Sequence, residues 1–300
     1  MKQISPKELI NVFSQKPNQS SNFQLSPIIN SVDYSDCDRV LAFIMQYPQH
    51  PLSQQIQNAI TIIRRQFRQY SRLSLSFNGG KDATVLLHLV RTVCVIMSRF
   101  LQTEEPHTIF RRLVRVFVIH VEKQFPEISE FLIESEIKYN LGIHVYQGID
   151  FKQNLQNFID DFSPEICFVG VRKGDPTSKG VIQQASPGWP QVVRCSALYD
   201  FEFLDVFDFL LRFNYKYCEL YNKGFTSIGG IENSYQNEKL TGRDIKELVK
   251  SGQNDRVVDQ LLDRGISVEK IEEQYIDDLS QPAFFVSRLE INERGQRNNK

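Results

Sequence analysis

A short glycine-containing loop in the first third of the chain has the residue types that bind phosphate. It reads Ser76-Phe77-Asn78-Gly79-Gly80-Lys81-Asp82. Glycines let a backbone turn several N–H groups toward one anion without a Cβ clash, and lysine adds a positive charge. A carboxylate can hold Mg²⁺ against phosphate oxygens. The loop therefore predicts a site for a nucleoside triphosphate, with Asn78, Lys81 and Asp82 as catalytic candidates and Asp82 as the magnesium ligand.

The alternative for this loop is a plain strand-to-helix turn with Lys81 and Asp82 in solvent. A bare Asn-Gly-Gly would favour that alternative. Here a hydroxyl, a lysine and a carboxylate surround the glycines, and the loop lies between an apolar β-type run and an apolar helical run. Binding is therefore the better interpretation, although the loop is not a Walker A motif, because G-x-x-x-x-G-K-[ST] is absent.

A second cluster of polar residues follows a later apolar run. The segment starting at Gly170 reads G-V-R-K-G-D-P, and the chain's single tryptophan, Trp189, lies in P-G-W-P shortly before Arg194. Basic residues suit a phosphorylated ligand, and an indole ring offers a flat stacking surface. The cluster predicts a planar aromatic phosphate as ligand, with an Asp-Pro turn and a packed tryptophan as the alternative.

Both clusters need strands that end at one edge of a sheet. A helical period over 52–70 leads into a strand over 73–77, and Asp82 can cap the long apolar helix that follows. Further alternation is expected: strands over 113–121, 143–146 and 165–171, and helices over 126–139 and 151–162. This order predicts an α/β fold, a mainly parallel twisted sheet with helices on both faces, which is Rossmann-like, with a helical N-terminal segment and a C-terminal subregion. Ligands then lie at the carboxyl ends of the strands, which adds His120, Gly170 and Arg172 to the ATP-binding candidates.

Composition narrows the class of protein. The 300 residues carry a formal net charge of -1, so nucleic acid is not an expected partner. The five cysteines show neither C-x-x-C pairs nor metal-finger spacing, which favours reduced thiols in the cytoplasm. We find no stretch of transmembrane length free of charge, so a membrane is not an expected partner either.

The motifs together resemble one enzyme family. The loop is similar to the S-x-N/G-G-G-K-D signature of PP-loop ATP pyrophosphatases, which have an adenine nucleotide alpha hydrolase-like fold. G-V-R-K-G-D-P, P-G-W-P, D-V-F-D-F-L from Asp205 and Y-C-E-L-Y-N-K-G-F-T-S-I-G over 217–229 resemble eukaryotic FAD synthetases, in the PAPS-reductase-like branch. The resemblance spans about 73–240, resumes at 282–285 and closes with E-R-G-Q-R over 293–297.

This resemblance implies a nucleotidyltransferase, an FMN adenylyltransferase that makes FAD and pyrophosphate from FMN and ATP with Mg²⁺. The implied ATP-binding residues are Ser76, Phe77, Asn78, Gly79, Gly80, Lys81, Asp82, His120, Gly170 and Arg172. The implied flavin-binding residues are Asp175, Ser186, Trp189, Arg194, Arg294 and Arg297. Asp175 and Arg297 join the catalytic candidates Asn78, Lys81 and Asp82. We expect a cytoplasmic monomer, with client flavoproteins as candidate partners.

Four regions follow from this interpretation. They are an N-terminal extension over 1–51, partly helical; a PP-loop nucleotide-binding domain over 52–240; a helical insertion over 241–280; and a flavin- and phosphate-binding tail over 281–300. The insertion has a lid and a decorative surface hairpin as its two interpretations.

Departures from the family keep other functions open. Ser186 lies where the family usually has Asp, and Ser196-Ala197 replaces an Asn-Pro pair. Phe201 and Phe207 replace tryptophans. A catalytically inactive nucleotide- or flavin-binding module is therefore one alternative. A sulfonucleotide-reductase-like enzyme is another, but its chemistry needs a cysteine near the C-terminus and the last one here is Cys218.

Overall fold

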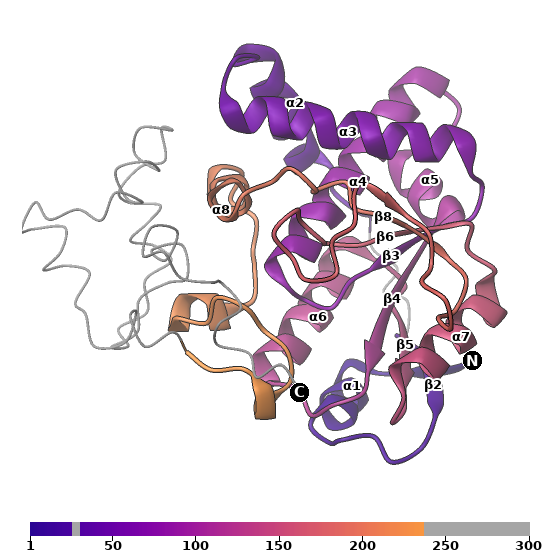
Figure 1. Ribbon diagram of the computed structural model, residues 1–300. Helices are drawn as coiled ribbons and strands as arrows, with labels where there is room; N and C mark the ends of the chain where they lie inside the picture. Colours follow the sequence, from indigo (N-terminus) through magenta and orange to yellow (C-terminus); the bar gives the residue numbers. More distant parts are fainter. Residues whose placement is uncertain (26–30, 237–300) are drawn as a thin grey trace, which may run out of the picture. The chain divides into compact units, whose positions relative to one another are not determined.

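A computed structural model describes residues 1–25 and 31–236 (Figure 1). The chain divides into two compact units, 1–201 and 202–300. Strands of the first unit are β1 Lys2–Ile4, β2 Ser21–Leu25, β3 Leu73–Ser76, β4 Val114–His120, β5 His144–Gln147, β6 Ile166–Phe168, β7 Ile182–Gln183 and β8 Val193–Cys195. Its helices are α1 Pro6–Phe13, α2 Ser35–Gln46, α3 Pro51–Gln69, α4 Lys81–Leu101, α5 Pro106–Leu113, α6 Pro126–Tyr139 and α7 Phe151–Phe162.

The first unit is built on one mixed sheet. Its strand order is β1-β2-β5-β4-β3-β6-β8-β7. The central run β5-β4-β3-β6-β8 is parallel, whereas β2 pairs antiparallel with β5 and β7 antiparallel with β8. The predicted α/β fold with a mainly parallel sheet is therefore confirmed.

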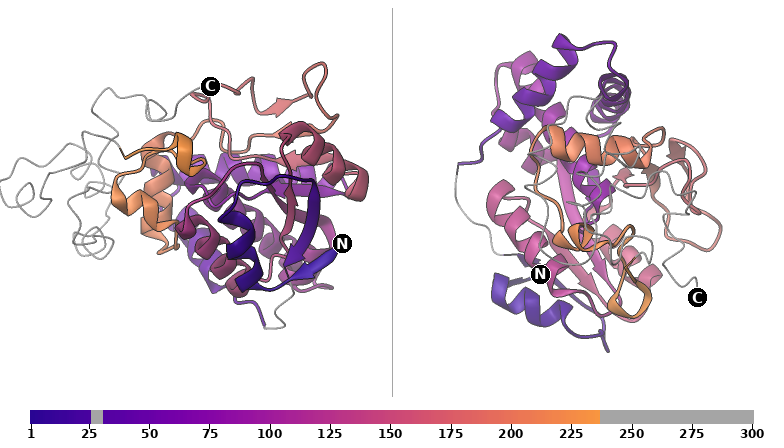
Figure 2. Two further views of the ribbon diagram at one scale, coloured as in Figure 1. Left: turned by 90° about the horizontal axis from the view of Figure 1, so that it is seen from below. Right: turned by 90° about the vertical axis from the view of Figure 1, so that its left-hand side faces the viewer.

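The strand order reverses beside β3, and this position matters for ligands. From β3 the chain moves to β4 and then β5 on one side, and then crosses to β6 on the other side of β3. Right-handed crossovers place α4 and α6 on one face and α7 on the opposite face, and Figure 2 shows helices on both sides of the sheet. The loops after β3 and β6 diverge at this switch point, where open sheets bind ligands.

Helix α4 is the central helix of the unit, as its apolar sequence predicts. Fourteen of its residues, from Lys81 to Val95, are buried. By length and composition it could cross a membrane, but 67% of its most apolar window is buried inside the protein. It contains Lys81, Asp82, Arg91 and Arg99, so it is not a stretch free of charge. The N-cap is Gly80, not Asp82. Asp82 is the second residue of the helix, because the extended backbone at Gly80 starts the helix two residues earlier than predicted.

The N-terminal 51 residues contribute more than helices. Strand β1 pairs parallel with β2, and β2 extends the sheet beside β5. Arg91 of α4 holds α2 through Asp36, with Nη1 at 2.5 Å from Oδ2. Strand β1 is only three residues long, and β2 shows just two apolar residues in alternation, Phe23 and Leu25, so neither strand was predicted.

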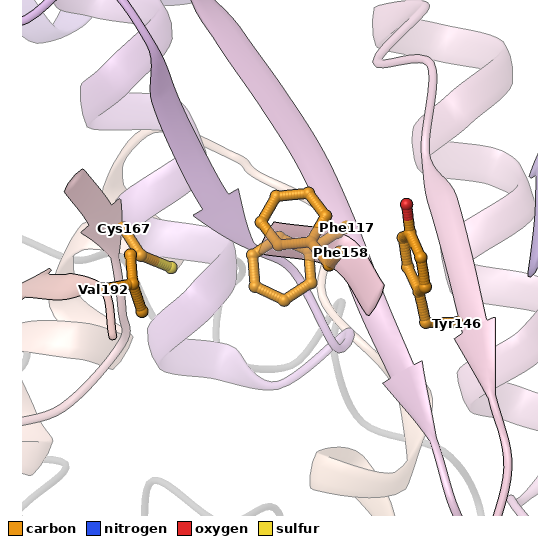
Figure 3. Close-up of a cluster of buried hydrophobic side chains, with 5 residues drawn as sticks. All are labelled: Phe117, Tyr146, Phe158, Cys167 and Val192. Carbon is orange, nitrogen blue, oxygen red and sulfur yellow. The ribbon is translucent and has the colours of Figure 1, made fainter. Parts of the chain in front are cut away.

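An aromatic cluster fills the space between α7 and the sheet. Phe158 of α7 stacks on Phe117 of β4 with ring centroids 3.9 Å apart, and Tyr146 of β5 meets Phe158 edge-on (Figure 3). Cys167 and Val192 belong to the same cluster. This packing fixes α7 over one face of the sheet, next to the carboxyl ends of β3 and β6.

The second unit is described only as far as residue 236. It contains α8 Phe203–Arg212 and two short 3₁₀ helices, Glu219–Lys223 and Ile231–Asn233. Phe207 of α8 packs edge-on against Tyr217 and Tyr221, at 5.8 and 6.0 Å between ring centroids. The two motifs D-V-F-D-F-L and Y-C-E-L-Y-N therefore pack together. The expected insertion over 241–280 and tail over 281–300 lie outside the described residues, and the four predicted region boundaries stay predictions.

Candidate active site

The glycine-containing loop links the end of β3 to the start of α4. The Phe77 N–H donates to the Phe117 carbonyl at 2.9 Å, and the Gly80 N–H donates to Oδ1 of Asn78 at 3.1 Å. Gly79 has φ +77°, which favours glycine. Gly80 has no side chain with which to cap α4, so the first turn of a long helix presents its N–H groups to an acceptor from elsewhere. Such a helix start is a suitable position for an anion.

Three charged side chains meet at this helix start. One carboxylate oxygen of Asp82 lies 3.2 Å from Nζ of Lys81, and the other lies 2.7 Å from Nε of Arg172. The side chains of Lys81 and Arg172 are only 2% and 7% exposed. Asp82 therefore holds two cations, Lys81 and Arg172, beside the helix N-terminus.

Gly170 explains how the loop after β6 reaches α4. A Cβ at Gly170 would lie 2.9 Å from the backbone nitrogen of Ala83, which is too close for a real side chain. Asp175 then shapes the rest of the loop: its Oδ2 accepts from the Arg172 N–H at 2.8 Å. The two loops predicted from sequence are therefore brought together at the switch point of the sheet.

A cavity of about 440 Å³ opens beside these loops. Strand register places Ser76 opposite Phe117 and Cys167 opposite Arg194, and all four line the cavity. The other lining residues are Phe151, Leu155, Val169, Pro176, Thr177, Lys179, Ala185, Ser186, Trp189, Pro190 and Val192. This size and mainly apolar lining suit a planar small molecule.

Trp189 is held at the cavity by a tight turn. Its N–H donates to the Ser186 carbonyl at 3.0 Å, and Gly188 takes φ +75°, as the third residue of a type II turn requires. The indole meets Phe151 of α7 edge-on at 6.3 Å, and Nζ of Lys152 lies 4.8 Å from the ring centroid. The ring keeps 41% of its surface exposed, so it has a face available for stacking.

Comparisons with known proteins agree with this geometry. A family model described as "Phosphoadenosine phosphosulfate reductase domain" matches residues 72–154 and 151–236, more than half of the chain. The "Probable FAD synthase" of Schizosaccharomyces pombe is 30% identical over 198 residues, which cover 63% of this chain and 72% of that protein. The chain belongs to the FAD synthases of this domain family.

Solved structures of FAD synthases share the fold. The crystal structure of yeast FAD synthetase in complex with FAD matches with a TM-score of 0.60 and 25% identity, over 84% of this chain and 95% of that chain. The Candida glabrata FMN adenylyltransferase, solved in complex with FMN and the ATP analogue AMPCPP, matches with a TM-score of 0.61 and 20% identity, over 89% and 99% of the two chains. At that identity the second match shows the fold alone.

Most of the predicted residues of this FAD synthase lie around one site. Ser76, Ser186, Trp189 and Arg194 line the cavity. The loop residues, with Gly170, Arg172 and Asp175, form the adjoining phosphate-type site described above. Arg294 and Arg297 lie outside the described residues.

His120 lies apart from these residues. It is fully buried at the end of β4, where its ring packs against Phe13 at 4.5 Å and its Nε2 lies 3.0 Å from the Gln15 carbonyl oxygen. Burial lowers the pKa of His120, so the imidazole is neutral at pH 7. The structure gives His120 a contact with the N-terminal segment, and its role toward ATP stays a prediction.

Sequence reasoning missed several cavity residues. Phe117 and Cys167 are strand residues. Strand register decides on which face of the sheet their side chains lie, and no local sequence pattern gives the register. Phe151 and Leu155 lie one turn apart on α7, a spacing that could have marked a shared helix face. No motif or spacing in the sequence marks Lys179 as a cavity residue.

All five cysteines of this FAD synthase are buried. Burial raises the pKa of the Cys167 thiol to about 11 and that of Cys195 to about 12. A nucleophilic cysteine needs thiolate character at neutral pH. The buried cysteines therefore speak against thiol chemistry of the sulfonucleotide-reductase type.

Proposed function

We propose that this chain transfers the adenylyl group of ATP to FMN and releases FAD and pyrophosphate. The observation that carries the proposal is the shared strand end: Ser76 begins the phosphate-type loop and also lines the aromatic cavity. A planar ring in the cavity and a triphosphate on the loop would then be neighbours. FMN and ATP are the pair of substrates that this arrangement fits.

The reaction needs alignment more than a protein nucleophile. An oxygen of the FMN phosphate attacks the α-phosphorus of ATP, and the bond from that phosphorus to the oxygen bridging to the β-phosphate breaks. Pyrophosphate carries that bridging oxygen and the electron pair away. Holding the two phosphates in line converts a bimolecular step into a local one, which accounts for a large part of such rate enhancements.

The chain's own groups supply charge neutralisation. The N–H groups in the first turn of α4 donate to triphosphate oxygens, and Asn78 keeps the loop in the required turn by accepting from the Gly80 N–H. Lys81 and Arg172 place positive charge beside these donors. Because the charge is fixed before substrate arrives, it stabilises the developing negative charge on the leaving pyrophosphate.

Asp82 fits Mg²⁺ as a single carboxylate ligand. The described residues contain no group of three or more His, Cys, Asp and Glu side chains that could hold a metal alone. Mg²⁺ in nucleotide sites is commonly held by one or two carboxylates together with substrate phosphates. Asp82, 17% exposed at the helix start, is the carboxylate in the position to do so. When bound, Mg²⁺ would neutralise phosphate charge.

We also propose that the protein acts as a cytoplasmic monomer that passes FAD to client flavoproteins. The net charge of -1 and the five buried thiols support this setting. Sedimentation of the purified full chain at micromolar concentration would detect a dimer and so contradict the monomer.

The test of the function is product formation by the purified chain. The protein is mixed with FMN, ATP and Mg²⁺, and flavins are separated by chromatography with fluorescence detection. Riboflavin and adenylyl sulfate replace FMN in parallel reactions. We expect FAD and pyrophosphate in equal amounts from FMN only. Bound FMN or ATP without turnover would instead favour the inactive binding module.

A further inference from the structure

The cavity carries hydrogen-bond donors on its polar side. Lys179, Ser186 and Arg194 line it, and we call these three residues the donor rim. None of the described residues that line the cavity is an aspartate or a glutamate. Within the part of the chain that the structure describes, no carboxylate lies within ion-pair distance of Lys179 or Arg194. The polar side of the cavity therefore suits a ligand that presents hydrogen-bond acceptors.

Lys179 and Ser186 form a pair within the donor rim. Nζ of Lys179 lies 3.3 Å from Oγ of Ser186. An ammonium group can only donate, so the serine oxygen is the acceptor and the serine O–H is directed to another acceptor. The ammonium has two further N–H groups, so both side chains can donate to a ligand at once.

The backbone fixes the donor rim in place. Strand β7 pairs with β8, with Gln183 opposite Arg194, and the Ser196 N–H donates to the Val181 carbonyl at 2.7 Å. Ser186 begins the turn that ends at Trp189. The donors therefore lie on a loop anchored to the sheet and next to the indole ring.

The ring systems of the two substrates differ at their polar edges. The dioxopyrimidine edge of a flavin presents two carbonyl oxygens around a single N–H. Adenine presents an exocyclic amino group, which would face other donors at this rim. Lys179 is exposed, and Ser186 and Arg194 are partly buried. A donor of the ligand that faces donors of the protein loses a hydrogen bond on binding, which disfavours an amino group at this rim.

We propose that Lys179, held by Ser186, is the specificity-determining residue that donates to a carbonyl oxygen of the flavin ring edge. The proposal rests on the proposed function, in which FMN occupies the cavity. The protein then recognises the flavin ring edge by donating hydrogen bonds to its carbonyl oxygens, and not by accepting one from its N–H.

The test compares Lys179→Met with Lys7→Met. Lys7 is an exposed lysine of α1 and does not line the cavity, so its variant is the matched control. FMN affinity is measured by quenching of flavin fluorescence, and ATP affinity is measured separately. We expect Lys179→Met to bind FMN about tenfold more weakly, as loss of a charge-assisted hydrogen bond predicts, with ATP affinity unchanged. Lys7→Met should match the wild type in both.

Sulfur analogues locate the contact. In 2-thio-FMN and 4-thio-FMN, one carbonyl oxygen is replaced by sulfur, a weaker acceptor. The wild type should bind one of these analogues more weakly than FMN, and Lys179→Met should bind that analogue and FMN equally. Unchanged FMN affinity in Lys179→Met, or discrimination retained by that variant, overturns the proposal.

The Ser186→Ala variant tests whether Ser186 acts by positioning Lys179 or by contacting FMN directly. Because Ser186 positions Lys179, its loss should weaken FMN binding less than Lys179→Met does, and the double variant should resemble Lys179→Met alone. Additive effects would contradict the pairing. If the wild type neither binds FMN nor makes FAD, the proposed function fails and this inference with it. If the wild type makes FAD while Lys179→Met binds FMN normally, only this inference fails.

Discussion

Nε of Arg172, in the loop after β6, lies 2.7 Å from Oδ1 of Asp82 in the first turn of α4. This ion pair joins the two polar segments of the sequence at the switch point of the sheet. The same carboxylate contacts Lys81 through its other oxygen at 3.2 Å. Asp82 therefore arranges the two cations that we expect to face the triphosphate.

The first prediction concerns this pair. Arg172→Met and Asp82→Asn should each lower kcat/KM for ATP about 100-fold, because each breaks the ion pair that positions the buried cations at the start of α4. The double variant should be far less impaired than the product of the two single effects. Steady-state kinetics with a melting curve for each variant provides the measurement.

Arg99→Met is the matched control for that pair. Arg99 of α4 forms an ion pair with Asp38 of α2, but both side chains are more than half exposed. Exposed pairs contribute little to stability, so this variant should keep wild-type kinetics. Independent, multiplicative effects of Arg172→Met and Asp82→Asn would contradict the account.

The second prediction concerns Gly170. Gly170→Ala should raise the KM for ATP about tenfold and cost about 1–3 kcal/mol of stability, because the new Cβ forces apart the loop after β6 and the start of α4. Gly174→Ala is the control, since nothing lies within 4 Å of a Cβ at that position. Equal kinetics for the two variants would show that the close approach at Gly170 has no part in ATP binding.

The third prediction concerns the indole at the cavity. Trp189→Ala should weaken FMN binding about tenfold, whereas Trp189→Phe should lose less, because a smaller aromatic ring still offers a stacking face. Phe100→Ala removes another exposed aromatic ring, on α4 and outside the cavity lining, and should leave binding unchanged. In the wild type, FMN should quench the emission of Trp189, the only tryptophan. Absence of quenching at saturating FMN would place the flavin elsewhere.

Part of the fold and of the site could be predicted from the sequence. Apart from α5 Pro106–Leu113, which was not predicted, the order of strands and helices from 51 to 168 follows from hydrophobic periodicity. The helices over 126–139 and 151–162 have the predicted bounds. The loop at 76–82 and the segment from Gly170 were identifiable because glycine, charge and position at a strand end coincide. Those two segments carry the chemistry of the site.

Other features depend on tertiary structure and could not be predicted. Strand β2 joins the sheet by pairing with β5, and β1 by pairing with β2, although both are too short for their own sequences to predict them. The cavity lining depends on strand register, which sets the facing of Phe117 and Cys167. The pairing of Lys179 with Ser186 depends on how the loop between β6 and β8 folds back.

The fourth prediction concerns acid stability. Burial, with Arg115 and Arg111 nearby, lowers the pKa of His144 to about 4, below the 6.5 of an unperturbed histidine. The unfolded chain therefore binds this proton first, so stability is full above pH 6.5 and falls as the pH drops toward 4. The loss from this one group should reach ~2–3 kcal/mol by pH 4.5.

His144→Phe removes that proton site while keeping a buried ring. Denaturant unfolding at pH 7.0 and pH 4.5 should show a smaller difference between the two pH values in this variant than in the wild type. Phe162→Leu is the control, since Phe162 packs against the His144 ring at 4.5 Å between centroids and carries no titrating group. An equal pH dependence for His144→Phe and the wild type would show that His144 does not contribute.

The most direct test of the account follows the oxygen atoms through the reaction. FMN labelled with ¹⁸O in its phosphate is incubated with the purified chain, unlabelled ATP and Mg²⁺, and the products are analysed by mass spectrometry. We predict that FAD keeps every labelled oxygen and that pyrophosphate carries none, because the FMN phosphate attacks the α-phosphorus of ATP. Label in pyrophosphate, or saturable binding of both substrates without any FAD, would contradict it.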